Sequence, residues 1–356
     1  MIRLARPDVG AAEAAAVAEV LESGRLTMGP KVTEFEALLA EACAVEHALV
    51  VSSGTAALHL AVLALGVGPG DEVLVPAYTF PATANVVAKA GATPVLVDVD
   101  PRTMNLDVAR VAAAVTPRTQ AVIAVHLFGR PLDWEALGAA VPEGVVLVED
   151  AAGALGARWR GRPCGGLGLL GCLSFHPRKI VTTGEGGAVT TPDGDLAQRI
   201  REMRDHGIDR RGEFEIVSPG LNYRLSDILC AVGIPQLERL EELLRAREQL
   251  AAAYAERLSE EVELPGAEDG DRHGWQAYVV RLDRRNEALQ ALRDEGIEAQ
   301  IGTYALHRLG AYRDQGPFRG ADRCYERALA LPFHTGLGPD DVERVARVLD
   351  KVVSDH

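Results

Sequence analysis

The first half of the chain alternates short apolar runs with alanine-rich stretches of helical periodicity. The apolar runs are residues 48–53, 72–77, 93–99, 120–128 and 144–150, and the helical stretches are 55–65, 82–90, 107–115 and 133–140. Two further helices are predicted before them, at 11–23, where Gly24 ends the helix, and at 31–44. Short runs that are apolar on both faces and separated by helices predict an α/β domain with a mainly parallel sheet.

The pattern changes after Ser226. Residues 227–260 form a long charged helical region, for which we expect a break or kink near Gly233–Pro235. A joint rich in Pro, Gly and Asp follows at 264–274, and then a strand at 276–282, a helix at 286–296 and a closing helix from Pro339. The expected organisation is a large domain at 1–240 and a smaller C-terminal α+β domain at 241–356.

Composition and charge restrict the partners. The chain has 356 residues with a formal net charge of -14, and either nucleic acid or an anionic membrane would require a basic face instead. An anionic substrate would need a local cluster of donors and cations. The five cysteines are scattered and odd in number, no metal-ligand spacing occurs, and no apolar run is long enough to span a membrane. We therefore expect a cytoplasmic protein with reduced thiols and no metal.

In parallel sheets, ligands bind beyond the carboxyl ends of the strands. That rule selects five segments of this chain, at 52–55, 76–80, 98–100, 126–129 and 150–153. The stretch S-F-H-P-R-K-I-V-T-T-G-E-G-G (174–187) adds a single lysine, Lys179, among small and hydroxyl residues with no acid before Glu185.

Asp150 and Lys179 are candidates for one cofactor site. Alone, Asp150 is better explained as the N-cap of a helix, because Asp is a favoured cap and AAGALGA follows. Together the two residues supply a carboxylate that can keep a pyridine nitrogen protonated and an amine that can form a Schiff base. Pyridoxal 5'-phosphate requires both groups.

A phosphate site and a stacking surface are also present in the sequence. SSGTAALHLAVLAL (52–65) passes from a strand into a helix, where Gly54 permits close approach, Thr55 offers a hydroxyl and the helix N-terminus offers free N–H groups. Ser174 can add a second hydroxyl. Phe80 is our candidate for stacking on the flat ring, whereas neighbouring Tyr78 fits core packing equally well.

These motifs resemble a known family. VSSGTAALHLA, VPAYTFPATANVV, VEDAAGALGA, LSFHPRKIVTTGEGGAV and GLNYRLSDILCAVG, in this order, are similar to the DegT/DnrJ/StrS sugar aminotransferases of fold-type I, which use pyridoxal phosphate. The resemblance covers nearly the whole chain, from SGRLTMGPKVTEFE (23–36) to LALPFHTGL (329–337).

The resemblance implies a role for several residues. Lys179 would carry the Schiff base, Asp150 would pair with the pyridine nitrogen, and Phe80 would stack on the ring. Gly54, Thr55 and Ser174 would hold the phosphate. Asn222 would reach a phosphate across a dimer interface, which implies an obligate homodimer with shared active sites. One position departs from the family: Gly153 stands where many members have Gln or His beside the cofactor.

Five more residues are candidates for substrate contact, each with a structural alternative. His126 and His176 lie near the predicted site, and either could equally be a packed or loop-stabilising histidine. Tyr304 and His307 belong to a small-domain segment that faces the substrate in the family. Arg224 could bind a carboxylate or phosphate, or form an ordinary ion pair. Glu185 fits a turn as well as a substrate contact.

The hypothesis from the sequence is an aminotransferase that transfers an amino group from glutamate or glutamine to a keto sugar, with a nucleotide-linked hexose as the expected substrate. The retained Lys179 favours transamination over the sugar-dehydratase branch, where histidine replaces the lysine. The alternatives are an aminocyclitol or aminobenzoate synthase, a pyridoxal-dependent eliminase, and a non-catalytic regulator on the same scaffold.

Overall fold

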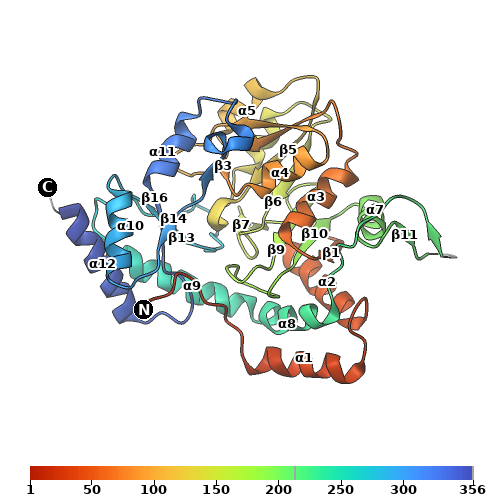
Figure 1. Cartoon of the computed structure of the whole chain (residues 1–356), viewed down its shortest axis with the longest axis horizontal. Coiled ribbons are helices and arrows are strands. Elements are labelled where there is room, and N and C mark those ends of the chain that lie inside the picture. Colours follow the sequence, from red (N-terminus) through yellow and green to blue (C-terminus); the bar gives the residue numbers. More distant parts are fainter. Residues whose placement is uncertain (212–213, 355–356) are drawn as a thin grey trace.

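The computed structural model describes residues 1–211 and 214–354. Its centre is a seven-stranded sheet with the order β1-β10-β9-β6-β5-β2-β4 (Figure 1). The strands are β1 (His47–Val51), β2 (Glu72–Pro76), β4 (Thr93–Val97), β5 (Thr119–Val125), β6 (Val146–Asp150), β9 (Leu170–Ser174) and β10 (Gly187–Thr191). All neighbours pair in parallel except β10, which is antiparallel to β9 and β1. The α/β class with a mainly parallel sheet is confirmed.

Helices cover both faces of this sheet. One face packs on α3 (Gly54–Ala64), α4 (Ala82–Lys89) and α7 (Gly194–Arg204), and the other on α2 (Pro30–Cys43), α5 (Val108–Ala114), α6 (Trp134–Ala140) and α8 (Asp227–Glu238). α1 (Ala11–Ser23) packs on α8 and ends at Gly24, whose φ of 69° is the left-handed conformation that glycine adopts readily. This double cover explains why the strands are continuous apolar runs.

The second lobe is built on a small antiparallel sheet with the order β13-β16-β14. Its strands are β13 (Tyr278–Arg281), β14 (Gln300–Ile301) and β16 (Ala328–Leu331), and its helices are α10 (Arg285–Asp294), α11 (Arg319–Arg327) and α12 (Pro339–Ser354). A separate apolar core joins this sheet to α9 (Leu240–Ala255), α10 and α12, and includes Ile2 from the N-terminus. We propose that the domain boundary lies near residue 240 and that the first residues of the chain belong to the smaller lobe.

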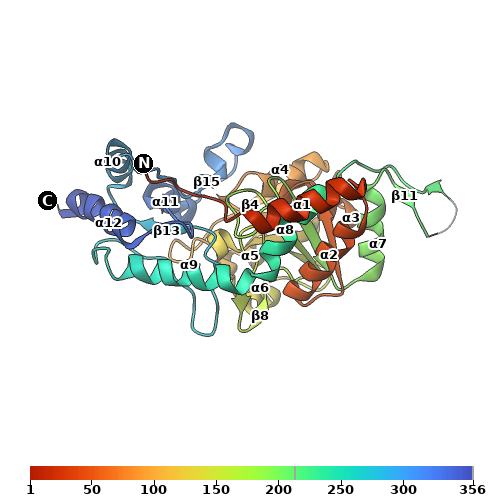
Figure 2. The same cartoon turned by 90° about the horizontal axis from the view of Figure 1, so that it is seen from below.

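The helical region after Ser226 differs from the expectation in one detail. The helical region is broken, but at Arg239 instead of near Gly233–Pro235: α8 continues through Pro235 to Glu238, and α9 begins at Leu240. A Cβ at Gly233 would lie 2.5 Å from the Phe35 ring, so this glycine permits close packing of α8 on α2. α9 then runs from the large lobe along the small one (Figure 2).

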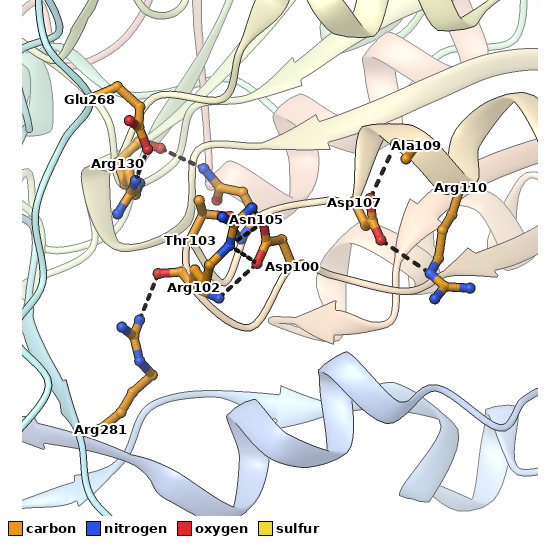
Figure 3. Close-up of polar contacts among 10 residues, drawn as sticks. All are labelled: Asp100, Arg102, Thr103, Asn105, Asp107, Ala109, Arg110, Arg130, Glu268 and Arg281. Atoms are coloured by element: carbon orange, nitrogen blue, oxygen red, sulfur yellow. Dashed lines mark hydrogen bonds and ion pairs between the residues drawn. The ribbon is translucent and has the colours of Figure 1, made fainter.

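Polar contacts fix the lobes against each other beside the ligand edge of the sheet (Figure 3). Arg281 of β13 donates to the carbonyl oxygen of Arg102 at 2.8 Å, and Arg130 pairs with Glu268 at 2.6 Å. The buried Asn105 amide donates to the Arg130 carbonyl oxygen at 3.1 Å. These contacts hold the turn after β5 in place, next to the candidate site.

Candidate active site

Asp150 ends β6, which lies between β5 and β9, and the residue is only 5% exposed. One oxygen accepts a hydrogen bond from the Thr83 hydroxyl at 2.8 Å, and the other accepts from the Ala152 backbone N–H at 3.2 Å. Burial raises the pKa of Asp150, while both hydrogen bonds and the positive charge of Lys179 act in the opposite direction. Thr83 therefore orients the carboxylate and favours its ionised form.

Lys179 lies in the loop between β9 and β10, which are short strands that the hydrophobic pattern did not predict. The loop is closed by hydrogen bonds from the Phe175 N–H to the Gly186 carbonyl oxygen and from the Thr182 hydroxyl to the Phe175 carbonyl oxygen, both 2.8 Å. Burial lowers the pKa of Lys179, Asp150 acts to raise it, and the charge of Arg178 lowers it further. The net shift favours the neutral amine, which is the form that can accept a proton.

The N-terminus of α3 opens toward the same region. The Ser53 side chain caps the helix by accepting from the Ala56 N–H at 3.0 Å. Gly54 is held so close to Ser174 that an added Cβ would lie 2.8 Å from the Ser174 Cβ. Thr55 is exposed at the first turn. These residues form a cradle of N–H and hydroxyl groups that suits a phosphate.

One cavity of about 660 Å³ connects these groups. Its wall includes Gly54, Thr55, Phe80, Asp150, Ser174 and Lys179, which are six of the seven predicted cofactor residues. Its size and its lining fit pyridoxal phosphate: the wall carries a carboxylate, an amine and an anion cradle from which a side chain at Gly54 would be excluded.

Phe80 and Tyr304 meet at the cavity. Phe80 follows β3 (Tyr78–Thr79) and is 62% exposed, so a large part of the residue is accessible to a ligand. β15 (Tyr304–Ala305) pairs with β3 and brings Tyr304 from the smaller lobe, with the two ring centroids 6.4 Å apart. Tyr78, in contrast, is buried and does not belong to the cavity lining; its hydroxyl accepts from the Thr303 N–H at 3.1 Å.

The histidine candidates separate into two groups. His176 and His126 line the cavity, but both ring nitrogens of His126 are already bonded. Its Nδ1 accepts from the Leu132 N–H at 3.0 Å, so its Nε2 carries the proton and donates to Glu149 at 3.0 Å. His307 lies outside the cavity lining, with its Nε2 3.0 Å from an Asp322 oxygen.

Two polar candidates also lie away from this chain's cavity. Arg224 forms an ion pair with Asp205. Asn222 is exposed and forms a backbone bridge with Asp205, and it does not line the cavity of its own chain. Its assignment to a partner's site stays a prediction.

Sequence reasoning missed the role of Glu149. This fully buried carboxylate accepts from the N–H groups of Gly165, Leu167 and Gly168 at 2.6, 2.6 and 2.8 Å. Its oxygen also lies within 4.8 Å of ligand atoms of His126 and Cys164, the one such cluster found in the described part of the chain. Since the Glu149 carboxylate already accepts these hydrogen bonds, we interpret the cluster as a structural one that stabilises the backbone around β6.

The space beside Gly153 is filled from the smaller lobe. A Cβ at Gly153 would lie 3.4 Å from the Gln276 Oε1 and 3.5 Å from its Cβ. Gln276 also lines the cavity, and its N–H donates to the Phe128 carbonyl oxygen at 3.0 Å. The Gln276 side chain therefore occupies space beside Gly153, and no local pattern in the sequence could have paired Gly153 with a residue 123 positions later (276 − 153).

One cavity at the carboxyl edge of the α/β sheet contains a carboxylate, an amine whose pKa is lowered and a phosphate cradle. This combination defines a pyridoxal phosphate-dependent enzyme. Comparison with known proteins makes the class specific. A model of the DegT/DnrJ/EryC1/StrS aminotransferase family matches residues 7–350, and the chain belongs to this family. It is an aminotransferase with pyridoxal phosphate as cofactor, as the motifs indicated.

Individual relatives align along their whole length. The chain is 41% identical over 366 residues to the GDP-perosamine synthase of Caulobacter vibrioides, covering 99% of this chain and 98% of the relative. It is 37% identical over 372 residues to the spore coat polysaccharide biosynthesis protein SpsC of Bacillus subtilis, covering 98% and 96%. The solved aminotransferase TlmJ from Streptoalloteichus hindustanus superimposes with a TM-score of 0.95 at 38% identity, covering 99% and 100% of the two chains.

Proposed function

We propose that the protein transfers an amino group from glutamate or glutamine to the ketone of a nucleotide-linked hexose. The observation that carries the proposal is the single cavity in which Asp150 and Lys179 both line the wall. Lysine and aspartate far apart in sequence have no structural need to share a cavity, whereas pyridoxal chemistry requires this arrangement.

Each residue of the cavity lining has a separate role toward the cofactor. Bound in the cavity, the cofactor supplies an aldehyde for the amine and a ring that withdraws electrons from the reacting carbon. With the cofactor bound, Asp150, oriented by Thr83, would hold a proton on the ring nitrogen. Gly54, Thr55 and Ser174 would hold the phosphate, and Phe80 would stack on the ring. Lys179 would hold the cofactor covalently, and its amine, when free, would accept the proton that leaves the donor's α-carbon.

The substrate assignment rests on the relatives and on the cavity. Two relatives act in GDP-perosamine synthesis and in spore coat polysaccharide biosynthesis by their names, which favours an amino sugar as product. A cavity of about 660 Å³ also has room for a hexose besides the cofactor. We infer ketone amination on the hexose ring, at C4 or C3.

We also infer a cytoplasmic homodimer with shared active sites. Asn222 lies outside its own chain's cavity, which fits a contact with the partner's phosphate. Nearby, the hairpin of β11 (Ile208–Asp209) and β12 (Glu215–Ile216) projects from the body with Phe214 75% and Ile216 61% exposed (Figure 1). A second copy would cover these side chains. Among the described residues, no helix has both the length and the apolar character needed to cross a bilayer.

Amino transfer is tested with the purified holoenzyme. It should be yellow and should form an amino sugar from a GDP-linked 4-keto hexose and glutamate or glutamine, while Lys179→Ala should retain the cofactor and transfer nothing. A product from a keto cyclitol alone would favour the cyclitol branch, and release of a dehydrated sugar would favour elimination. A colourless protein that takes up no pyridoxal phosphate would refute the enzyme assignment.

Shared sites are tested by mixing two inactive variants. Lys179→Ala and Asn222→Ala subunits, reassociated at random in equal amounts, should regain about a quarter of the wild-type activity. About half of the dimers are then mixed, and one of the two sites in each mixed dimer is intact. If the mixture stays as inactive as its components although mixed dimers form, Asn222 does not serve the partner's site.

A further inference from the structure

Arg178 is a cation on the cavity wall without an acidic partner. Seven titratable side chains line the cavity: His126, Asp150, His176, Arg178, Lys179, Glu185 and Tyr304. Among the described residues, no carboxylate lies within ion-pairing distance of the Arg178 guanidinium, although the chain has 51 acidic and only 37 basic residues. Arg178 is exposed at the cavity wall, and an arginine of the cavity lining that has no acidic partner is available to bind an anionic group of the substrate.

The guanidinium is held in position by a neutral group. Its Nη1 donates to the Gln300 Oε1 at 3.0 Å, and Gln300 belongs to β14 of the smaller lobe and also lines the cavity. The Gln276 amide contacts the Arg178 carbonyl oxygen at 3.4 Å. An amide orients the guanidinium without cancelling its charge, and the side chain keeps N–H groups for a second, bidentate acceptor.

Arg178 also lies near the reacting amine. It directly precedes Lys179, and its charge lowers the pKa of Lys179. An anion bound by Arg178 would therefore sit close to the carbon at which the amino group is exchanged. The α-carboxylate of an amino acid is one bond from that carbon, whereas the diphosphate of a nucleotide sugar is separated from the ketone by the hexose ring.

We propose that Arg178 binds the α-carboxylate of the amino donor. The proposal rests on the amino transfer proposed above and adds which residue recognises the donor. Since glutamate and glutamine share the α-carboxylate and differ at the γ position, both donors depend on Arg178 to the same degree.

The test separates the two half-reactions. Holoenzyme is mixed rapidly with glutamate, and in parallel with glutamine, and the loss of the yellow form gives the donor concentration at half-maximal rate. GDP binding, measured by calorimetry, probes the nucleotide end independently. Arg178→Gln should raise the half-saturating concentration of both donors by about 10- to 100-fold and leave GDP affinity unchanged, since a charged hydrogen-bond pair is lost.

Matched variants control for indirect effects. Arg178→Lys keeps the charge without the fork and should fall between wild type and Arg178→Gln. Arg293→Gln removes an exposed arginine from α10, outside the cavity lining, and should change nothing.

Three outcomes would overturn the assignment: unchanged donor saturation, an effect on glutamate alone, which would indicate the γ-carboxylate, or an effect on GDP alone, which would indicate the diphosphate. Failure of the proposed function is distinguished in the wild type, which would then show no amino transfer with any donor.

Discussion

Replacing Thr83 by valine tests how the ionisation of the Asp150 carboxylate is controlled. Thr83 is fully buried, and its hydroxyl donates to the Asp150 Oδ2 at 2.8 Å. Valine has nearly the same shape but no hydroxyl, so the change removes this hydrogen bond, together with the long 3.5 Å contact between the Thr79 and Thr83 hydroxyls, and leaves the packing in place. Asp150 then retains only the weaker bond from the Ala152 N–H at 3.2 Å.

The expected magnitude follows from the charge of the acceptor. A hydrogen bond to an ionised group contributes about 1.5–3 kcal/mol, which corresponds to about 1–2 units in the pKa of that group. Burial already raises the pKa of Asp150 and Thr83 lowers it, so Thr83→Val raises it further. Ionised Asp150 is lost as pH falls through its pKa, and in the variant this loss begins at higher pH. Cofactor affinity should fall by about 10- to 100-fold at neutral pH.

The assay is titration of the apoenzyme with pyridoxal phosphate, followed by absorbance at a series of pH values. Thr83→Ser keeps the hydroxyl and should restore most of the affinity. If Thr83→Val binds the cofactor as tightly as wild type with the same pH dependence, the hydrogen bond does not control Asp150 and the reasoning fails.

Three further changes have defined outcomes. Asp150→Asn should reduce amino transfer by at least about 100-fold. The apoenzyme should stay as stable in thermal unfolding at pH 7, or become more stable, because burial raises the Asp150 pKa and so penalises its ionised form. A marked loss of apoenzyme stability would contradict this. Arg178→Gln should move the acidic limb of the pH–rate profile to higher pH, since the Arg178 charge lowers the Lys179 pKa and Lys179 must be neutral to accept a proton; an unmoved or oppositely shifted limb argues against it. Glu149→Gln should lower the free energy of unfolding by about 2–4 kcal/mol in urea denaturation, because an amide NH₂ cannot accept the bonds that the carboxylate accepts; wild-type stability would rule out the supporting role.

Much of the fold was predictable because its signals are local. Gly24 and Pro339 bound helices through backbone preferences that act at one position, and the sheet strands are apolar on both faces because helices cover both. Asp150 and Lys179 were predictable as a pair because pyridoxal chemistry asks for these two residue types, and the family motifs fix their order.

The remaining features depend on contacts between distant segments. β9 and β10 are short and rich in small residues, and they form only because β6 and β1 pair with them. Thr83, in a helix turn 67 residues before Asp150, carries no local sign of its bond to the carboxylate.

The ion pairs of an arginine also cannot be predicted from the sequence around it. Arg224, a sequence candidate for substrate binding, forms an ion pair in the fold with Asp205 at the end of α7. Conversely, Arg178 has no such partner within the described ranges, which only the folded chain could reveal.

The central claim is that Lys179 carries the cofactor in the cavity that Asp150 also lines. The chain has only four lysines, Lys31, Lys89, Lys179 and Lys351, and of these only Lys179 lines the cavity. Borohydride reduction of the holoenzyme followed by peptide mass spectrometry identifies the lysine that is bonded to the cofactor. The account predicts a pyridoxyl group on the Lys179 peptide alone; a pyridoxyl group on any other lysine, with Lys179 unmodified, would contradict it.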